Sequence, residues 1–533
     1  MEGAKGSSKK RVREEEEEDG IDFDDEQLNL DLDHLDSETI DKIVDRAPEV
    51  VLDSVGLKRM LLSFERGLTK NRQLRIKYPR QPDKFVESEV DLDEEIKKMH
   101  VIASVPHLYP EFIQLKAPES ILSLLIHDNT DITIDSLDLL KELTDIETFE
   151  EKEDQMSREH VKSLIEVLLE NQILELLVSN LNRLNESSTD EKSGVYNILA
   201  IVENLIEVKI EICEVIGEKT EILNWLLTRI QVREFDEVKL YASEILSILL
   251  QNSVGNQVKV GKLNGIDTML MAVSRYKKIN PPTTEEEELL ENIFDSLCIV
   301  CPLEDNKKFF TQAEGLKLLQ IMIKNKKFGR KCALKLLNYV LSNDLNNCRR
   351  WVQLPALGTL FAAFMKKGSK KHKKGFTEQD DEHILSIIAT LFKLFESSEN
   401  GKYWSRVLDK FREQNFEKVE RLLELREKYN EKLRGVERKI RMEKESQGED
   451  WDEEMENEAY LEKLDAGLFT LQLIDYVIAV ICKANEMIKT KVKQLLALQS
   501  SSFEDIKKIL IEYSHSLDDT EKNKILALAE QLQ

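Results

Sequence analysis

The sequence is poor in the residues that interrupt helices. Only 19 of its 533 residues are glycine and 10 are proline, so long helices can run without a break. No apolar run reaches the roughly 20 residues that a membrane-spanning helix needs. The first residues show no signal-peptide pattern either. We therefore expect a soluble, intracellular, helical protein without a membrane partner.

Motifs of catalysis and metal binding are also missing. The sequence has no phosphate-binding loop, no nucleophile motif and no pair among its eight histidines at metal-ligand spacing. Cys298 and Cys301 form a CxxC pair, but no second pair accompanies them. The six cysteines lie mostly in apolar helical runs, which favours a place in the core over a metal or redox role. We expect no enzyme activity, no metal and no cofactor.

Negative charge, by contrast, is abundant. The chain has 102 aspartates and glutamates against 76 lysines and arginines, a net charge of −26. Such a protein binds nucleic acid poorly and attracts basic partners. Its length is typical of several domains or of a repeat array, and its 41% hydrophobic residues can fill a continuous helical core.

The stretch from Tyr241 to Val273 shows the repeating element. A long apolar helix ends near Asn252, a short segment follows, and a turn at Asn264 and Gly265 leads into a second apolar helix. The order of a second helix and then a longer third helix occurs six times, and the long helices have corresponding positions at Leu143, Leu205, Leu249, Leu297, Val340 and Leu391. Their spacing of roughly 43 to 62 residues is that of armadillo repeats lengthened by loop insertions. We predict an all-α fold, a right-handed armadillo/HEAT-type α-solenoid.

The array has flanks of a different character. We predict four parts, namely an acidic disordered tail with a basic cluster (1–53), a helical N-terminal cap (54–118), the armadillo repeats (119–398) and a helical C-terminal region (399–533). A cap is needed because the open end of a solenoid exposes apolar surface. Residues 461–485 are apolar nearly all round and must be covered, either by later helices of the chain or by a second copy in a homo-dimer.

One helix start is marked by its local sequence. Pro281 and Pro282 precede Thr284, and Glu287 lies three residues further on. This spacing predicts a capping box with Thr284 as the N-cap residue.

Two basic clusters stand out from the acidic background. The first consists of Lys9, Lys10, Arg11, Val12 and Arg13, in a segment too polar to fold, and we predict that it is the nuclear localisation signal. The alternative is a solvated run of charge. The second cluster, residues 366–374, could touch RNA, act as a second localisation signal or be a solvated loop. No aromatic residues interleave with its lysines to stack on bases, so we expect no direct nucleic-acid binding.

Several long blocks resemble a known family. In chain order they are residues 71–109, 127–145, 197–205, 291–298 and 464–485. They are similar to the corresponding blocks of the beta-catenin-like protein 1 family of nuclear armadillo proteins, from about residue 54 to the C-terminus. The resemblance implies a non-enzymatic scaffold in the nucleus, associated with the nineteen-type complex of the spliceosome in pre-mRNA splicing. It also implies binding to basic, nuclear-localisation-like segments of splicing factors, including a Myb-domain cell-division-cycle splicing factor.

The third helices of an armadillo array line a groove, so their exposed positions form the candidate peptide site. The residues that we predict to face this groove are Asp138, Glu142, Asp145, Glu203, Asn204, Glu207, Glu244, Asn292 and Asp295. The carboxylates would hold a Lys/Arg-rich segment by charge-assisted hydrogen bonds, and the amides would bind its backbone. The alternative is that acidic residues are simply common in this chain.

A nuclear-import adaptor of the importin-alpha type is the alternative function. The groove of such an adaptor carries a ladder of Trp and Asn four residues apart on successive third helices. The corresponding pairs here are Asp138 and Glu142, Ala200 and Asn204, Glu244 and Ile248, Asn292 and Ser296, and Lys335 and Tyr339. Because the ladder is missing, the sequence favours the scaffold.

Overall fold

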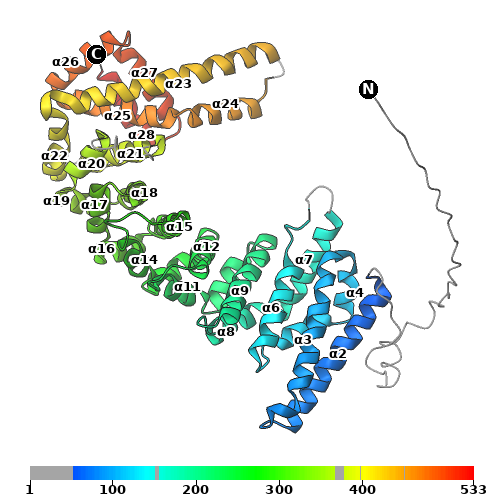
Figure 1. Ribbon diagram of the computed structural model, residues 1–533. Helices are drawn as coiled ribbons and strands as arrows, with labels where there is room; N and C mark the ends of the chain where they lie inside the picture. The colour runs from blue at the N-terminus through cyan, green and yellow to red at the C-terminus, as the bar shows by residue number, and fades with distance from the viewer. Residues whose placement is uncertain (1–51, 150–154, 367–376, 397, 449–450, 533) are drawn as a thin grey trace, which may run out of the picture. The chain divides into compact units, whose positions relative to one another are not determined.

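The computed structural model describes residues 52–149, 155–366, 377–396, 398–448 and 451–532. Every regular element in these ranges is a helix, so the predicted all-α class is confirmed (Figure 1). The chain divides between Asn171 and Gln172 into two compact units. The four-part division predicted from the sequence stays a prediction.

Unit 1, which ends at Asn171, contains a 24-residue helix, α2 (Ser54–Lys77), that packs on the next helix, α3. The start of α2 is fixed by Asp53, whose side chain accepts a hydrogen bond from the Gly56 N–H at 2.7 Å. Apolar residues spaced by three and four form its buried face, namely Leu57, Leu61, Phe64 and Leu68. The elements that follow are η3 (Pro82–Lys84), α3 (Val86–Lys98), η4 (Met99–Ser104), η5 (Pro106–Leu108), α4 (Tyr109–Gln114), α5 (Ala117–Leu124), α6 (Thr130–Thr144) and α7 (Gln155–Glu170).

Unit 2 starts at Gln172 and carries the repeats as two shorter helices followed by a longer one. The helices are α8 (Ile173–Arg183), α9 (Thr189–Val208), α10 (Ile212–Lys219), α11 (Ile222–Gln231), α12 (Glu237–Gln251), α13 (Val254–Lys262), α14 (Gly265–Ser274), α15 (Thr284–Val300), α16 (Glu304–Gln312), α17 (Gly315–Asn325), α18 (Gly329–Leu341), α19 (Leu345–Gln353), α20 (Leu357–Phe364) and α21 (Glu378–Leu394). The second helices predicted from the sequence correspond to α5, α8, α11, α14, α17 and α20. The predicted third helices correspond to α6, α9, α12, α15, α18 and α21.

The third helices of unit 2 form one continuous layer. Helix α9 packs on α12, α12 on α15, α15 on α18, and α18 on α21 (Figure 1). Each helix buries its apolar stripe and leaves the polar residues between those positions in one shared surface. This layer positions the candidate site.

A buried asparagine in the first helix of a repeat ties it to the repeat before. The Asn256 side chain donates hydrogen bonds to the carbonyl oxygens of Cys213, at 2.6 Å, and Leu249, at 3.1 Å. Asn306 repeats this contact one layer on, to Gln257 and Val300. A Cβ atom on Gly217 would lie 1.8 Å from the Asn256 Oδ1, and on Gly261 it would lie 2.0 Å from the Asn306 Oδ1. The two glycines therefore give the asparagine side chains the room that these bonds require.

The capping box predicted at Thr284 is placed one residue too late. The N-cap of α15 is Thr283, and its side-chain oxygen accepts a hydrogen bond from the Glu286 N–H at 3.2 Å. Thr284 is the first helical residue. Either threonine can serve as an N-cap, and the extended backbone at Thr283 decides between them.

The C-terminal part of unit 2 wraps one apolar helix. Helix α25 (Leu468–Ala484) contacts helices on several sides. The other elements of this part are η7 (Ser398–Asn400), α22 (Gly401–Arg412), η8 (Gln414–Phe416), α23 (Glu417–Gln447), α24 (Glu453–Asp465), α26 (Glu486–Leu498), α27 (Phe503–Ser514) and α28 (Asp519–Glu530). Because α21, α23, α26, α27 and α28 all pack on α25, the chain itself covers this helix. Its burial therefore requires no second copy.

No single helix in the described ranges is long and apolar enough to cross a membrane. One bent pair, α24 with α25 at 62°, meets the length and composition of a span. Most of α25 is buried among the other helices of the unit.

Candidate peptide-binding face

Three glutamates of successive third helices come together in unit 2. Glu203 lies on α9, Glu244 on α12 and Glu288 on α15. Glu244 is half-buried, and its burial together with the charges of Glu288 and Glu203 raises the pKa of its carboxyl above the usual range. Burial is the larger cause, and the neighbouring negative charges add to it. We call these three residues and their surroundings the α9–α15 face.

Two tyrosines lie within the same face. The Tyr241 hydroxyl donates a hydrogen bond to the Glu203 Oε2, and burial with this bond raises the pKa of the phenol. The Tyr196 ring packs on the Tyr241 ring with 4.8 Å between centroids, and Tyr196 is 42% exposed. The face thus offers an aromatic surface beside its carboxylates.

The carboxylates of the α9–α15 face have no basic neighbour in reach. Glu203, Glu244 and Glu288 form no ion pair with any lysine or arginine that the structure describes. Carboxylates without an ion-pair partner keep a strong local field, because no opposite charge cancels theirs. Such a field attracts a cationic segment.

The next step along the layer, between α15 and α18, has the opposite character. Lys335 of α18 forms an ion pair with Asp295 at 2.6 Å, and Lys331 pairs with Glu291. On its other side α15 contacts α12, where Asn292 donates a hydrogen bond to the Ser243 hydroxyl at 3.2 Å. The predicted groove residues Asp295 and Asn292 are thus in the expected layer, but their polar groups are engaged within the chain.

The three predicted groove residues of α6 and its C-terminus belong to unit 1, and two of them pair with neighbours. Asp138 pairs with Lys141 at 2.9 Å, and Glu142 lies 2.7 Å from the Nδ1 of His100. Asp145 lies just past the end of α6, and its side chain accepts a hydrogen bond from the Glu147 N–H at 3.0 Å. Its geometry is that of a turn-forming residue.

Of the two remaining predicted residues on α9, Asn204 is half-buried and Glu207 is exposed near the end of the helix. Both have partners within the chain.

Glu288 and the two tyrosines were not predicted from the sequence, although helical spacing could have found them. Glu288 precedes Asn292 by four residues, and Tyr241 precedes Glu244 by three, so each pair shares a helix face.

The cysteines show the environment of a core. All six are free and buried. Burial raises the pKa of the Cys213 thiol to about 11 and that of Cys332 to about 12. A thiol with a pKa this high stays protonated at neutral pH and is a poor nucleophile and metal ligand.

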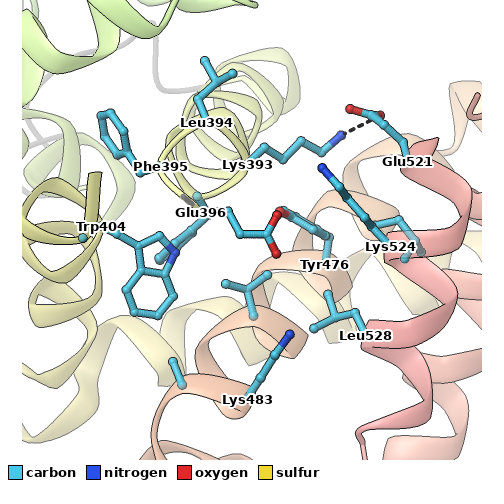
Figure 2. Close-up of a pocket in the computed structure, with 15 residues that line it drawn as sticks. Lys393, Leu394, Phe395, Glu396, Trp404, Tyr476, Lys483, Glu521, Lys524 and Leu528 are labelled. Carbon is cyan, nitrogen blue, oxygen red and sulfur yellow. Dashed lines mark hydrogen bonds and ion pairs between the residues drawn. The ribbon is translucent and has the colours of Figure 1, made fainter. Parts of the chain in front are cut away.

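A cavity lies in the C-terminal part, between α21, α22, α25 and α28, with a volume of about 660 Å³. Phe395, Trp404 and Tyr476 contribute aromatic surface to it, and Figure 2 shows charged side chains from α21, α25 and α28 around them. Lys393 reaches across to Glu521 with 3.3 Å between Nζ and Oε2. No sequence motif indicated this cavity, because its walls come from three separate parts of the sequence, within 392–404, 476–484 and 521–528.

Both predicted basic clusters lie outside the described residues, except Lys366. The localisation signal at Lys9, Lys10, Arg11, Val12 and Arg13 is among residues 1–51. Lys366 pairs with Asp381 at 3.0 Å, and residues 367–374 are not described. The roles of both clusters stay predictions.

Stacked triplets of helices with an exposed layer of third helices define a protein of the armadillo class. The chain belongs to the family described as catenin-beta-like, Arm-motif containing nuclear, which matches residues 36–511. It is 43% identical over 495 residues to beta-catenin-like protein 1 of Mus musculus and of Homo sapiens, which covers 90% of this chain and 86% of each relative. It is 34% identical over 477 residues to the Schizosaccharomyces pombe homolog, which covers 88% and 80% of the two chains. The predicted armadillo fold and family are thereby confirmed.

Proposed function

We propose that this chain is a non-enzymatic scaffold of the nuclear pre-mRNA splicing machinery, associated with the nineteen-type complex, and that its α9–α15 face binds basic segments of splicing factors. A Myb-domain cell-division-cycle splicing factor is the expected first partner. The observation that supports this proposal is a set of three neighbouring carboxylates, on Glu203, Glu244 and Glu288. Among the described residues, no lysine or arginine forms an ion pair with them.

The chemistry of the face suits lysine and arginine. Guanidinium and ammonium groups form charge-assisted hydrogen bonds with carboxylates, and these are roughly twice as strong as neutral ones. A partner cation would also offset the burial and the carboxylate repulsion that together raise the pKa of Glu244. The exposed ring of Tyr196 adds a surface for the aliphatic stem or the cation of a basic side chain.

Charge reversal of the face tests the proposal. In the triple variant Glu203→Lys/Glu244→Lys/Glu288→Lys, binding of a fluorescent basic peptide from a Myb-type splicing factor should fall by roughly 100-fold, because each exposed ion pair contributes at most about 1 kcal/mol. Fluorescence anisotropy at low and moderate salt measures this loss. Circular dichroism checks that the helices are retained.

A control triple separates local binding from net charge. Glu218→Lys/Glu221→Lys/Asp267→Lys changes the total charge equally, at exposed positions on or beside the first and second helices. This control should bind the peptide within a few-fold of the parent chain. Equal loss in both triples would mean a general charge effect, and unchanged binding by the folded α9–α15 variant would place the site elsewhere. Recovery of importin beta instead of splicing proteins from nuclear extract would favour an import adaptor.

A further inference from the structure

A separate group of cation-ligating side chains lies in unit 1, where η4 packs on α6. Helix α6 contributes Asp138 and Glu142, which are four residues apart and so share one helix face. The 3-10 segment η4 contributes His100. The ligand atoms of all three residues lie within 4.8 Å of one another. The closest pair, the His100 Nδ1 and the Glu142 Oε2, is 2.7 Å apart.

We infer that His100, Asp138 and Glu142 form a binding site for one divalent transition-metal ion of the zinc type. One imidazole nitrogen and two carboxylate oxygens are a ligand set that Zn²⁺ accepts, with water completing the coordination. Zn²⁺ holds nitrogen and oxygen ligands at about 2.0–2.2 Å, so its ligand atoms lie roughly 3.3 Å from one another. The three side chains reach this spacing by small rotations, because all of them are partly exposed.

The charges of the three side chains favour a dication. Asp138 and Glu142 carry two negative charges, and the imidazole of His100 is neutral when it ligates a metal. Three residues before Asp138 on α6, Asp135 shares Lys97 with Asp93, at 3.3 and 2.6 Å, so these two carboxylates have one ammonium group between them.

Lys141 is a partner of Asp138 that a metal ion can displace. Their ion pair lies at the surface, where such pairs contribute little. All six thiols are buried, so added zinc meets imidazole and carboxylate groups first in the folded chain. A bound ion would cross-link η4 to α6 and stabilise unit 1, with a gain that grows with the logarithm of the free zinc concentration above the dissociation constant.

Isothermal titration of the metal-free full-length chain with zinc chloride tests the site. We expect one micromolar site, an increase in melting temperature with zinc, and reversal by EDTA. His100→Ala and the pair Asp138→Asn/Glu142→Gln should each weaken zinc binding at least tenfold. The matched control is His107→Ala, an exposed histidine of the same unit, which should bind zinc like the parent chain.

The result that overturns the site is zinc binding that persists in His100→Ala and in the carboxylate pair variant. Equal loss in His107→Ala would do so too. Titration with magnesium or calcium chloride in place of zinc distinguishes metal coordination from charge attraction. A site that depends on His100 prefers zinc. Equal affinity for all three ions would contradict the role of the imidazole. If His100→Ala does not fold, as judged by circular dichroism, His100→Gln replaces it and the same outcomes apply.

Discussion

Two neighbouring steps of the third-helix layer differ in how they treat their carboxylates. Between α9 and α15, Glu203, Glu244 and Glu288 approach one another without a described cation. Between α15 and α18, Asp295 and Glu291 are matched by Lys335 and Lys331. Both regions are built from third helices that pack on one another: α9, α12 and α15 form the first step, and α15 and α18 form the second. The two steps therefore differ in Lys331 and Lys335, which neutralise the carboxylates of the second step. A basic ligand meets carboxylates without an ion-pair partner in the first step.

The comparison also separates two uses of acidic residues. A paired carboxylate at the surface contributes little to stability and nothing to recognition of a cation, because its partner is already present. An unpaired and half-buried carboxylate, such as Glu244, has a desolvation cost in the free protein. A binding partner can offset that cost, so the carboxylates that disfavour the isolated fold are the better candidates for function.

The largest expected effect comes from breaking the layer that supports the α9–α15 face. Asn256→Ala removes both hydrogen bonds to the buried carbonyl groups of Cys213 and Leu249. The loss of two buried hydrogen bonds should lower the free energy of unfolding by about 1–3 kcal/mol. Urea unfolding followed by circular dichroism measures this loss.

Asn252→Ala is the matched control. Asn252 is exposed, and its side chain donates to the Ile248 carbonyl oxygen at 2.9 Å at the end of α12. It should change stability by well under half of the Asn256 effect. Equal losses in the two variants would show that Asn256 does not tie the repeats together.

The helices and the surface position of two acidic residues could be predicted from the sequence, because both follow from local spacing. Apolar residues at intervals of three and four locate each third helix, and the positions between them identify Glu203 and Glu244 as surface residues. The pairing of Asp295 with Lys335 could not be predicted, since it joins residues forty positions apart and depends on the register between two helices. The turn at Asp145 was missed because the end of α6 precedes it, and helix ends are the least certain feature of a periodic pattern.

An intermediate effect should follow from making the second step resemble the first. Lys331→Gln/Lys335→Gln leaves Glu291 and Asp295 without their partners. The acidic surface then extends onto α15 and α18, and affinity for the basic peptide should rise by about three- to tenfold, since each freed carboxylate contributes at most about 1 kcal/mol.

Lys308→Gln is the control for that gain. Lys308 pairs with exposed carboxylates of α16, on a first helix rather than a third helix. It changes the net charge in the same direction and should leave peptide affinity nearly unchanged. If the α18 double variant also binds as the parent does, the ligand does not reach the second step.

The smallest effect, and the sharpest test of the comparison, concerns Glu244 alone. Burial and two neighbouring carboxylates raise its pKa in the folded chain above the value in the unfolded chain. The folded state therefore binds the Glu244 proton more tightly, and the stability from this proton is present at acidic pH and lost as the pH rises through the folded pKa. Glu244→Gln removes the ionisation, so it should raise the melting temperature at pH 7.5, and the gain should shrink at pH 5.5.

The same variant should bind the basic peptide up to about fivefold more weakly, because one carboxylate contact is lost. Glu218→Gln, at an exposed position of α10, should change neither quantity. A gain in stability that does not depend on pH would mean that the charge of Glu244 is not its source, whereas higher stability with weaker binding in one variant would tie the strain of this face to its function.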